Sequence, residues 1–463
     1  MSETTHPSSR QELRRRLARG IGATALNPII TAIIQLGTVP VLLHAWGAAK
    51  YGDWLILSAV PSYLSLTNLG FGDASGSDMT MRVASGDRRG ALETFHSSWV
   101  LLLIASALLL TIVSSIVWWI PWQRWTHLST LPDRQAAFVI LVLSLYIVIG
   151  QQCGVIESGF RCDGNFATGT LWGAAMRLAE AIVGCLAGVI TDQILYAAAA
   201  YLVARTAATL GYAALLRKRT PWLSFGFKHA RVDRVKALSV PALGFVALPL
   251  GYSIGIQGFT LMIAFLRGPL AVTIFSTLRT LTRLNFQLMT TIGWALWPEL
   301  SAAFGSGKIH FARNLHRRIY QVAVTLLLFT TSLLWFTGPI IYHAWIRNAV
   351  SFEGRCFHIL LIVTFLNSLW FMSSVIPMSA NAHHRLTLHF LAASLISLLI
   401  AWPLVTAIGV SGAAVALLFA ELWMTCVVLR ASLRQVQDSL ADFLRALVKV
   451  PHSWELDKLH EEV

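Results

Sequence analysis

The stretch LRKRTPWLSFGFKHARVDRVK, residues 216–236, separates two long apolar parts of the chain. Only 13% of the 463 residues are charged and 56% are hydrophobic, whereas a soluble domain carries about 25% charged residues. The mean hydropathy is +0.63, and the 17 tryptophans suit a protein with aromatic belts at two bilayer surfaces. The sequence therefore predicts an all-α polytopic membrane protein that this basic loop divides in two.

Apolar stretches of about 20 residues, the length that crosses a bilayer, follow one another along the chain. We predict twelve spans, at 21–45, 52–76, 94–120, 136–157, 167–190, 193–216, 236–264, 269–297, 317–341, 356–379, 386–408 and 410–431. The expected fold is therefore twelve transmembrane helices in two six-helix bundles. The expected order is a basic N-terminus (1–20), a bundle (21–216), the basic linker (217–235), a second bundle (236–431) and an amphipathic tail (432–463).

Basic residues alternate from one loop to the next. If the N-terminus is cytoplasmic, the loops and ends on that side hold twenty-six of the 36 lysines and arginines, and the opposite loops hold six. Such an excess marks the cytoplasmic side of a membrane protein. Both termini are therefore expected in the cytoplasm. The net charge of +14 follows from this topology and gives no reason to invoke nucleic acid.

The remaining four basic residues, Arg177, Arg205, Arg279 and Arg283, lie inside predicted spans. Each is roughly 15–21 Å from the end of its span at 1.5 Å per residue, near the middle of a ~30 Å core. An arginine at the centre of a spanning helix costs about 2.5 kcal/mol or more. Arg279 and Arg283 are four residues apart and leave the same helix face. These charges are expected to face a cavity or a partner.

The two halves of the chain repeat a sequence pattern. RVASGDRRGALETFHSS (82–98) and AAFGSGKIHFARNLHRR (302–318) both place glycine and basic residues before a helix start, about 221 positions apart. Six spans per half keep both copies in the same orientation. The pattern predicts parallel repeats about an axis along the membrane normal, as in transporters with a site between two bundles.

The stretch VPVLLHAWGAAKYGDWLILSAVPSYLSLTNLGFGDA (39–74) resembles the junction of the first two spans in the Wzx-type polysaccharide transporter flippases. These flippases are part of the multidrug/oligosaccharidyl-lipid/polysaccharide exporter superfamily. Tyr51-Gly52 matches the family pattern, whereas Asn68 replaces the more usual acid and Asp53 replaces a more usual apolar residue. LRGPLAVTIFSTLRTLTR (266–283) resembles the counterpart of this junction in the second half.

The resemblance implies a V-shaped pair of bundles, as in the MATE exporters, that alternates between inward-open and outward-open states. The implied cargo is a polyprenyl-pyrophosphate-linked oligosaccharide, carried across the bacterial inner membrane. Membrane lipids and a polysaccharide polymerase are the other implied partners. No enzymatic activity, cofactor or metal is expected, and an H+ or Na+ gradient is the expected driving force.

The mid-span arginines suit a pyrophosphate, because guanidinium groups form bidentate, charge-assisted hydrogen bonds to phosphate oxygens. Arg177, Arg205, Arg279 and Arg283 are therefore the predicted substrate-binding residues. Two structural alternatives stay open. Arg177 has Glu180 three residues on, a spacing that allows an ion pair. Arg279 or Arg283 has an alternative partner in Glu421 of the last span.

Acidic and helix-bending residues complete the candidate site. Asp73, Glu180 and Glu421 are candidate carriers of the coupling ion, because intramembrane carboxylates bind protons or sodium. Prolines remove a backbone hydrogen bond and kink helices. The candidate hinges are Pro61, Pro241, Pro249 and Gly251, with static kinks as the alternative.

Two other functions and two arrangements of the tail stay open. A multidrug exporter of the same superfamily shares the fold, but organic cations suit acids better than four arginines. A membrane polysaccharide polymerase or ligase needs a sizeable external loop, and the expected loops are short. In the tail, residues 438–450 have apolar residues at helical spacing, so this segment either lies on the inner membrane surface or packs on the protein.

Overall fold

The computed structural model describes residues 7–68, 71–236, 247–380, 382 and 384–448, and every regular element in these ranges is helical. The chain forms two compact units, Met1–Thr273 and Ile274–Val463. The boundary lies inside helix α10 (Phe259–Thr282), later than the linker 217–235 that the sequence favoured. Contacts of α9 (Ala247–Ser253) and its continuation with helices of the first unit account for this shift.

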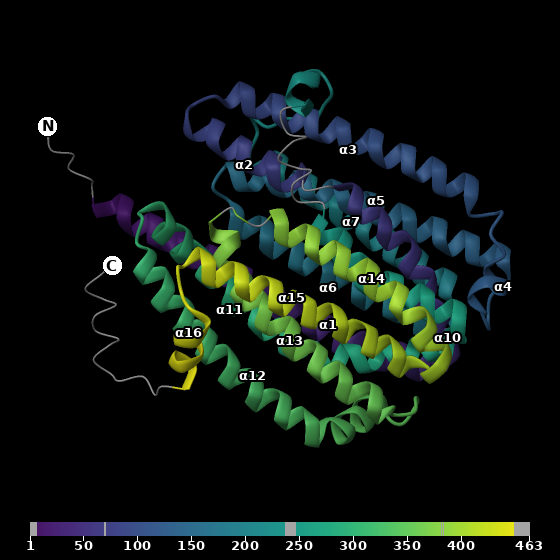
Figure 1. Cartoon of the computed structure of the whole chain (residues 1–463). Helices are drawn as coiled ribbons and strands as arrows, with labels where there is room; N and C mark the ends of the chain where they lie inside the picture. The colour runs from purple at the N-terminus through teal and green to yellow at the C-terminus, as the bar shows by residue number, and fades with distance from the viewer. Residues whose placement is uncertain (1–6, 69–70, 237–246, 381, 383, 449–463) are drawn as a thin grey trace, which may run out of the picture. The chain divides into compact units, whose positions relative to one another are not determined.

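The first unit is arranged around α5 (Asp133–Cys162), which packs against most of the other helices of the unit. Figure 1 shows these helices from purple to teal. They are α1 (Pro7–Ser62), η1 (Tyr63–Asn68), α2 (Phe71–Ala84), α3 (Arg88–Ile116), α4 (Trp122–Thr126), α6 (Phe166–Thr191) and α7 (Ile194–Arg219), followed by α9, η2 (Ile254–Gly258) and the first part of α10.

The second unit is arranged around α13 (Gly354–Ser379), which packs against α11 (Leu284–Gly305), α12 (Ile309–Ile346) and α15 (Val410–Gln435). Helix α14 (His384–Ile408) pairs with α15. The short helix α16 (Leu440–Val448) lies beside α12 (Figure 1). Helix α13 starts 221 residues after α5 and takes the same central place in its unit.

Ten helices of the described residues are long and apolar enough to cross a membrane, where the sequence predicted twelve spans. The difference has a physical reason, because two pairs of predicted spans follow one another without a loop. Leu26–Leu66 runs for 41 residues and Pro249–Thr282 for 34. At 1.5 Å per residue, a straight helix of either length is well above a ~30 Å hydrocarbon core.

Each of these two helices breaks at a glycine. Gly47 has φ 74° and ψ 171°, and Gly268 has φ 79° and ψ −176°. Only glycine adopts this region readily, because any Cβ would be strained there. The two glycines are 221 residues apart, and so are Gly86 and Gly307, which have φ 83° and 72°. The repeat is therefore present in the backbone conformation as well as in the sequence.

The two glycine breaks come together within the first unit. The hydroxyl of Thr273 donates to the carbonyl of Ala48 at 2.7 Å. A Cβ added to Gly52 would overlap the carbonyl group of Pro269, so these two backbones touch. Pro269 is the repeat counterpart of Ala48, and Thr273 is the counterpart of Gly52. We call these two reciprocal contacts the glycine-break contact.

Candidate functional site

A buried ion pair joins three helices of the first unit. Arg205 of α7 donates from Nη2 to Glu180 Oε2 of α6 at 2.6 Å and to the Tyr146 hydroxyl of α5 at 2.5 Å. The Tyr146 hydroxyl donates to the same carboxylate oxygen at 3.1 Å, and the Arg205 guanidinium lies 4.4 Å from the tyrosine ring centroid. The Glu180 and Arg205 side chains are 2% and 14% exposed. Two of the predicted site residues therefore meet each other.

A glycine on α5 leaves space for this ion pair. Gly150 of α5 lies against the Arg205 guanidinium, and a Cβ there would collide with it. Glu180 Oε1 and Arg205 Nε are buried without a hydrogen-bond partner. The carboxylate therefore accepts from both donors through Oε2, and a role of Glu180 in proton coupling stays a prediction. Proton uptake at Glu180 would remove the negative charge that holds Arg205 in place.

Arg177 binds a neutral partner instead of an acid. Its Nη2 donates to Asn27 Oδ1 of α1 at 2.7 Å, and both residues are partly buried. The alternative in which Glu180 pairs with Arg177 is not the observed pairing, because the Glu180 carboxylate is bound by Arg205. Spacing along one helix favoured Arg177, whereas contact between neighbouring helices selected Arg205.

Arg279 and Arg283 belong to the second unit and are both partly exposed. The Arg279 guanidinium lies 5.3 Å from the Phe275 ring centroid, and the Arg283 guanidinium lies 5.8 Å from that of Phe286. Arg283 stands at the junction where α10 ends and α11 begins. The helix break and the two arginines therefore fall together. Convergence of these arginines with Arg177 and Arg205 of the other unit stays a prediction.

Glu421 is the buried acid of the second unit. Its carboxylate accepts hydrogen bonds from Asn367 Nδ2 at 3.0 and 3.1 Å and from Trp370 Nε1 at 2.5 Å. Both donors lie on α13, and Arg283 acts on the same carboxylate electrostatically. Asn367 follows Tyr146 by the repeat offset of 221. In each unit, therefore, a buried glutamate accepts a hydrogen bond from the central helix, and the donors Tyr146 and Asn367 are at equivalent positions of the repeat.

The other predicted residues have simpler surroundings. Asp73 lies in α2, and the surroundings of its side chain are outside what the structure describes. Pro61 precedes the change from α1 to the 3-10 turn η1, and Pro249 and Gly251 precede the π-helical turn η2. Pro241 lies outside the described residues. These three residues lie next to irregular helical turns, and bending at the predicted hinges stays a prediction.

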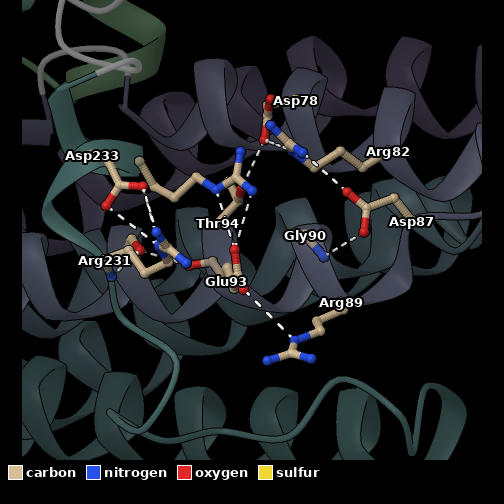
Figure 2. Close-up of polar contacts among 11 residues, drawn as sticks. Asp78, Arg82, Asp87, Arg89, Gly90, Glu93, Thr94, Arg231 and Asp233 are labelled. Atoms are coloured by element: carbon tan, nitrogen blue, oxygen red, sulfur yellow. Dashed lines mark hydrogen bonds and ion pairs between the residues drawn. The ribbon is translucent and has the colours of Figure 1, made fainter.

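Part of the linker docks on the first unit, which the sequence did not predict. Arg234 Nη2 donates to Glu93 Oε2 of α3 at 3.1 Å, and the backbone amide of Arg231 donates to Ser97 Oγ at 2.9 Å. Figure 2 shows Glu93 facing this segment, with Arg231 bound to Asp233 nearby. Linker residues 217–234 are therefore part of the folded unit.

A second ion cluster holds the turn before α3 (Figure 2). Arg82 donates to Asp78 at 2.7 Å and to Asp87 at 3.1 Å, and Thr94 donates to Asp78 at 2.6 Å. The backbone amide of Gly90 and the nearby Arg82 keep the pKa of Asp87 below its ordinary value. This cluster fixes the turn around Gly86 and serves the fold.

Asp53 is a buried acid that the sequence singled out only as a departure from the family pattern. Its carboxylate is fully buried and accepts hydrogen bonds from Thr130 N at 2.8 Å and Thr130 Oγ1 at 2.6 Å. Ser129 adds longer bonds from its backbone amide and hydroxyl. The acid therefore anchors the loop after α4 beside the glycine-break contact.

No family model matches the sequence, and no curated protein matches it. Solved structures are similar over nearly the whole chain. An inward-facing multidrug resistance MATE family transporter of the MOP superfamily has a TM-score of 0.75 at 14% identity, over 90% of this chain and 98% of that one. The lipid II flippase MurJ, in an inward closed conformation, has a TM-score of 0.71 at 12% identity, over 91% and 90%.

A third similar structure is a MOP superfamily transporter from Pyrococcus furiosus, described as having a binding pocket of reverse polarity. Its TM-score is 0.65 at 14% identity, over 94% of this chain and 96% of that one. These likenesses show that the chain has the MATE-like fold of the MOP superfamily. The matched structures are transporters and a flippase, not enzymes.

Proposed function

We propose that this chain moves a polyprenyl-pyrophosphate-linked oligosaccharide across the bacterial inner membrane by alternating access, with both termini in the cytoplasm. Its fold is shared with a multidrug resistance transporter and with the lipid II flippase MurJ. The alternation of basic loops supports the orientation. Twelve crossings follow if the chain reverses direction at Gly47 and Gly268.

The observation that carries the proposal is the pair Arg279 and Arg283, one helical turn apart and both partly exposed. A pyrophosphate carries about two negative charges, which are very costly to bury without partners. Two guanidinium groups four residues apart supply bidentate donors for its oxygens. Arg205 has a smaller role in this proposal, because Glu180 already neutralises it. Arg177 retains a neutral partner and so retains its charge.

Export of organic cations is the second candidate, because the MATE structure of similar fold is that of a multidrug resistance transporter. A cation site requires exposed acids. Both mid-span glutamates are buried and bound by polar groups, which favours the anionic cargo.

The test is binding of a polyprenyl-pyrophosphate oligosaccharide to the purified protein, with an organic cation dye as the competing ligand. Charge-assisted hydrogen bonds contribute about 1.5–3 kcal/mol each, so each of Arg279→Ala and Arg283→Ala should weaken binding by about tenfold or more. Arg124→Ala, in the short helix α4, is the control and should bind as the wild type does. Unchanged binding in the double variant, or tight binding of the dye alone, would refute the proposal.

A further inference from the structure

Helix α16 packs on α12 through one side and leaves an apolar pair exposed. Phe443 is fully buried, 5.2 Å from the His316 ring centroid and 5.0 Å from that of Tyr320. Leu440 and Leu444, one turn apart, are 53% and 51% exposed. The helix therefore packs on the protein, which is one of the two arrangements left open by the sequence, and it also presents an exposed apolar pair.

Polar contacts fix α16 in this position. Arg317 of α12 donates to both carboxylate oxygens of Asp438, at 2.7 and 2.5 Å. Ser439 Oγ accepts from the Asp442 amide at 3.0 Å, which caps the first turn. Gln321 of α12 donates to the carbonyl of Leu447 at 3.3 Å. Contacts at both ends of α16 therefore fix its position along α12.

The position of α16 along α12 indicates what surrounds Leu440 and Leu444. Of the contacts with α16 named above, that of Gln321 lies furthest along α12. The exposed apolar face of α12 begins with Val322, which is 60% exposed, and continues with Phe329 at 66% and Phe336 at 78%. A spanning helix exposes such side chains to lipid. In the orientation of the proposed function, on which this inference rests, the arginines at the start of α12, including Arg317, lie at the boundary between bilayer and cytoplasm. The apolar face of α16 thus continues a lipid-facing surface at the depth of the headgroups.

The charge around α16 matches an anionic surface. Arg445 is 76% exposed, and Arg430 and Arg434 at the end of α15 are exposed as well. The inner leaflet carries anionic lipids that attract such residues. We propose that α16 is an interfacial lipid-binding helix, with Leu440 and Leu444 in the acyl-chain boundary and the arginines on anionic phospholipid headgroups.

The test uses the full chain in nanodiscs of mixed anionic and zwitterionic phospholipid. Cys426→Ala removes the one exposed cysteine among the five, since the other four are buried. A fluorophore is attached at Leu444→Cys or, as the matched control, at Asp442→Cys, which lies on another face of the same helix and is 56% exposed. Quenching is measured with brominated lipid and with aqueous iodide.

The proposal expects bromolipid to quench the probe at position 444 severalfold more than the probe at 442, and iodide to show the reverse order. It also expects lipid quenching at 444 to fall in nanodiscs of zwitterionic lipid alone. Equal iodide quenching at both positions would place the helix in water. Protection of position 444 from both quenchers would show that protein covers it, and either result would overturn the proposal.

Discussion

Removal of one member of the buried ion pair should destabilise the first unit, and removal of both should not. In Arg205→Met, the Glu180 carboxylate stays 2% exposed and loses its counter-ion. An unpaired buried charge of this kind costs about 3–5 kcal/mol. Glu180→Gln leaves Arg205, 14% exposed, with the Tyr146 hydroxyl as a neutral partner and should cost a similar amount. The double variant replaces both charges by neutral groups of similar size and should regain most of the loss.

The assay follows thermal unfolding with a thiol-reactive dye in a Cys426→Ala background. Cys153, Cys162 and Cys185 of the first unit are buried, so they react only when this unit opens. The two single variants should unfold at clearly lower temperatures than the parent, and the double variant should lie close to it. The control Arg177→Met removes a cation whose observed bond is to a neutral amide, and it should cost less. If the double variant is as unstable as the singles combined, the coupling inferred from the 2.6 Å contact is wrong.

Two further predictions concern the backbone and the tail. Gly268→Ala and Gly47→Ala place a Cβ where the backbone has φ near 75°, so each should lower the free energy of unfolding by about 1–3 kcal/mol in the same assay. Gly37→Ala is the control, because a Cβ at this position of α1 meets open space. Equal stability of all three variants would contradict the backbone strain inferred at Gly47 and Gly268. Burial raises the pKa of Asp438, but hydrogen bonds and charge from Arg317 outweigh this and hold the pKa below its ordinary value. The ion pair therefore stabilises α16 docking above about pH 4 and loses this effect as the pH falls further. Limited proteolysis of the tail should show this transition in the wild type and not in Asp438→Asn; an identical pH profile would exclude the ion pair as its cause.

Composition and loop charge were enough to predict a polytopic all-α protein, because both depend only on which residues lie near each other in sequence. The repeat was also accessible, since its two copies share glycines at one offset. The number of separate helices could not be predicted, because Gly47 and Gly268 connect successive predicted spans without any polar loop. A backbone that changes direction at a single glycine leaves almost no signal in hydropathy.

The partner of Arg205 could not be predicted for a different reason. Its span contains no acid at helical spacing, and Glu180 comes from the helix before it. Spacing within one helix therefore favoured Arg177, whereas the packing of α6 against α7 places Arg205 on the Glu180 carboxylate. The positions of the arginines were readable from the sequence, whereas their partners depended on helix packing.

The glycine-break contact shows what duplication allows a chain to do. In a dimer of identical halves, each residue beside the two-fold axis has to serve both sides of the interface. Here, one side has Gly52, whose lack of a side chain lets the Pro269 carbonyl approach, and the other has Thr273, whose hydroxyl binds Ala48. Once the halves share one chain, the two positions are free to diverge. The two contacts at equivalent repeat positions are accordingly made by unlike groups, a backbone approach on one side and a hydroxyl on the other.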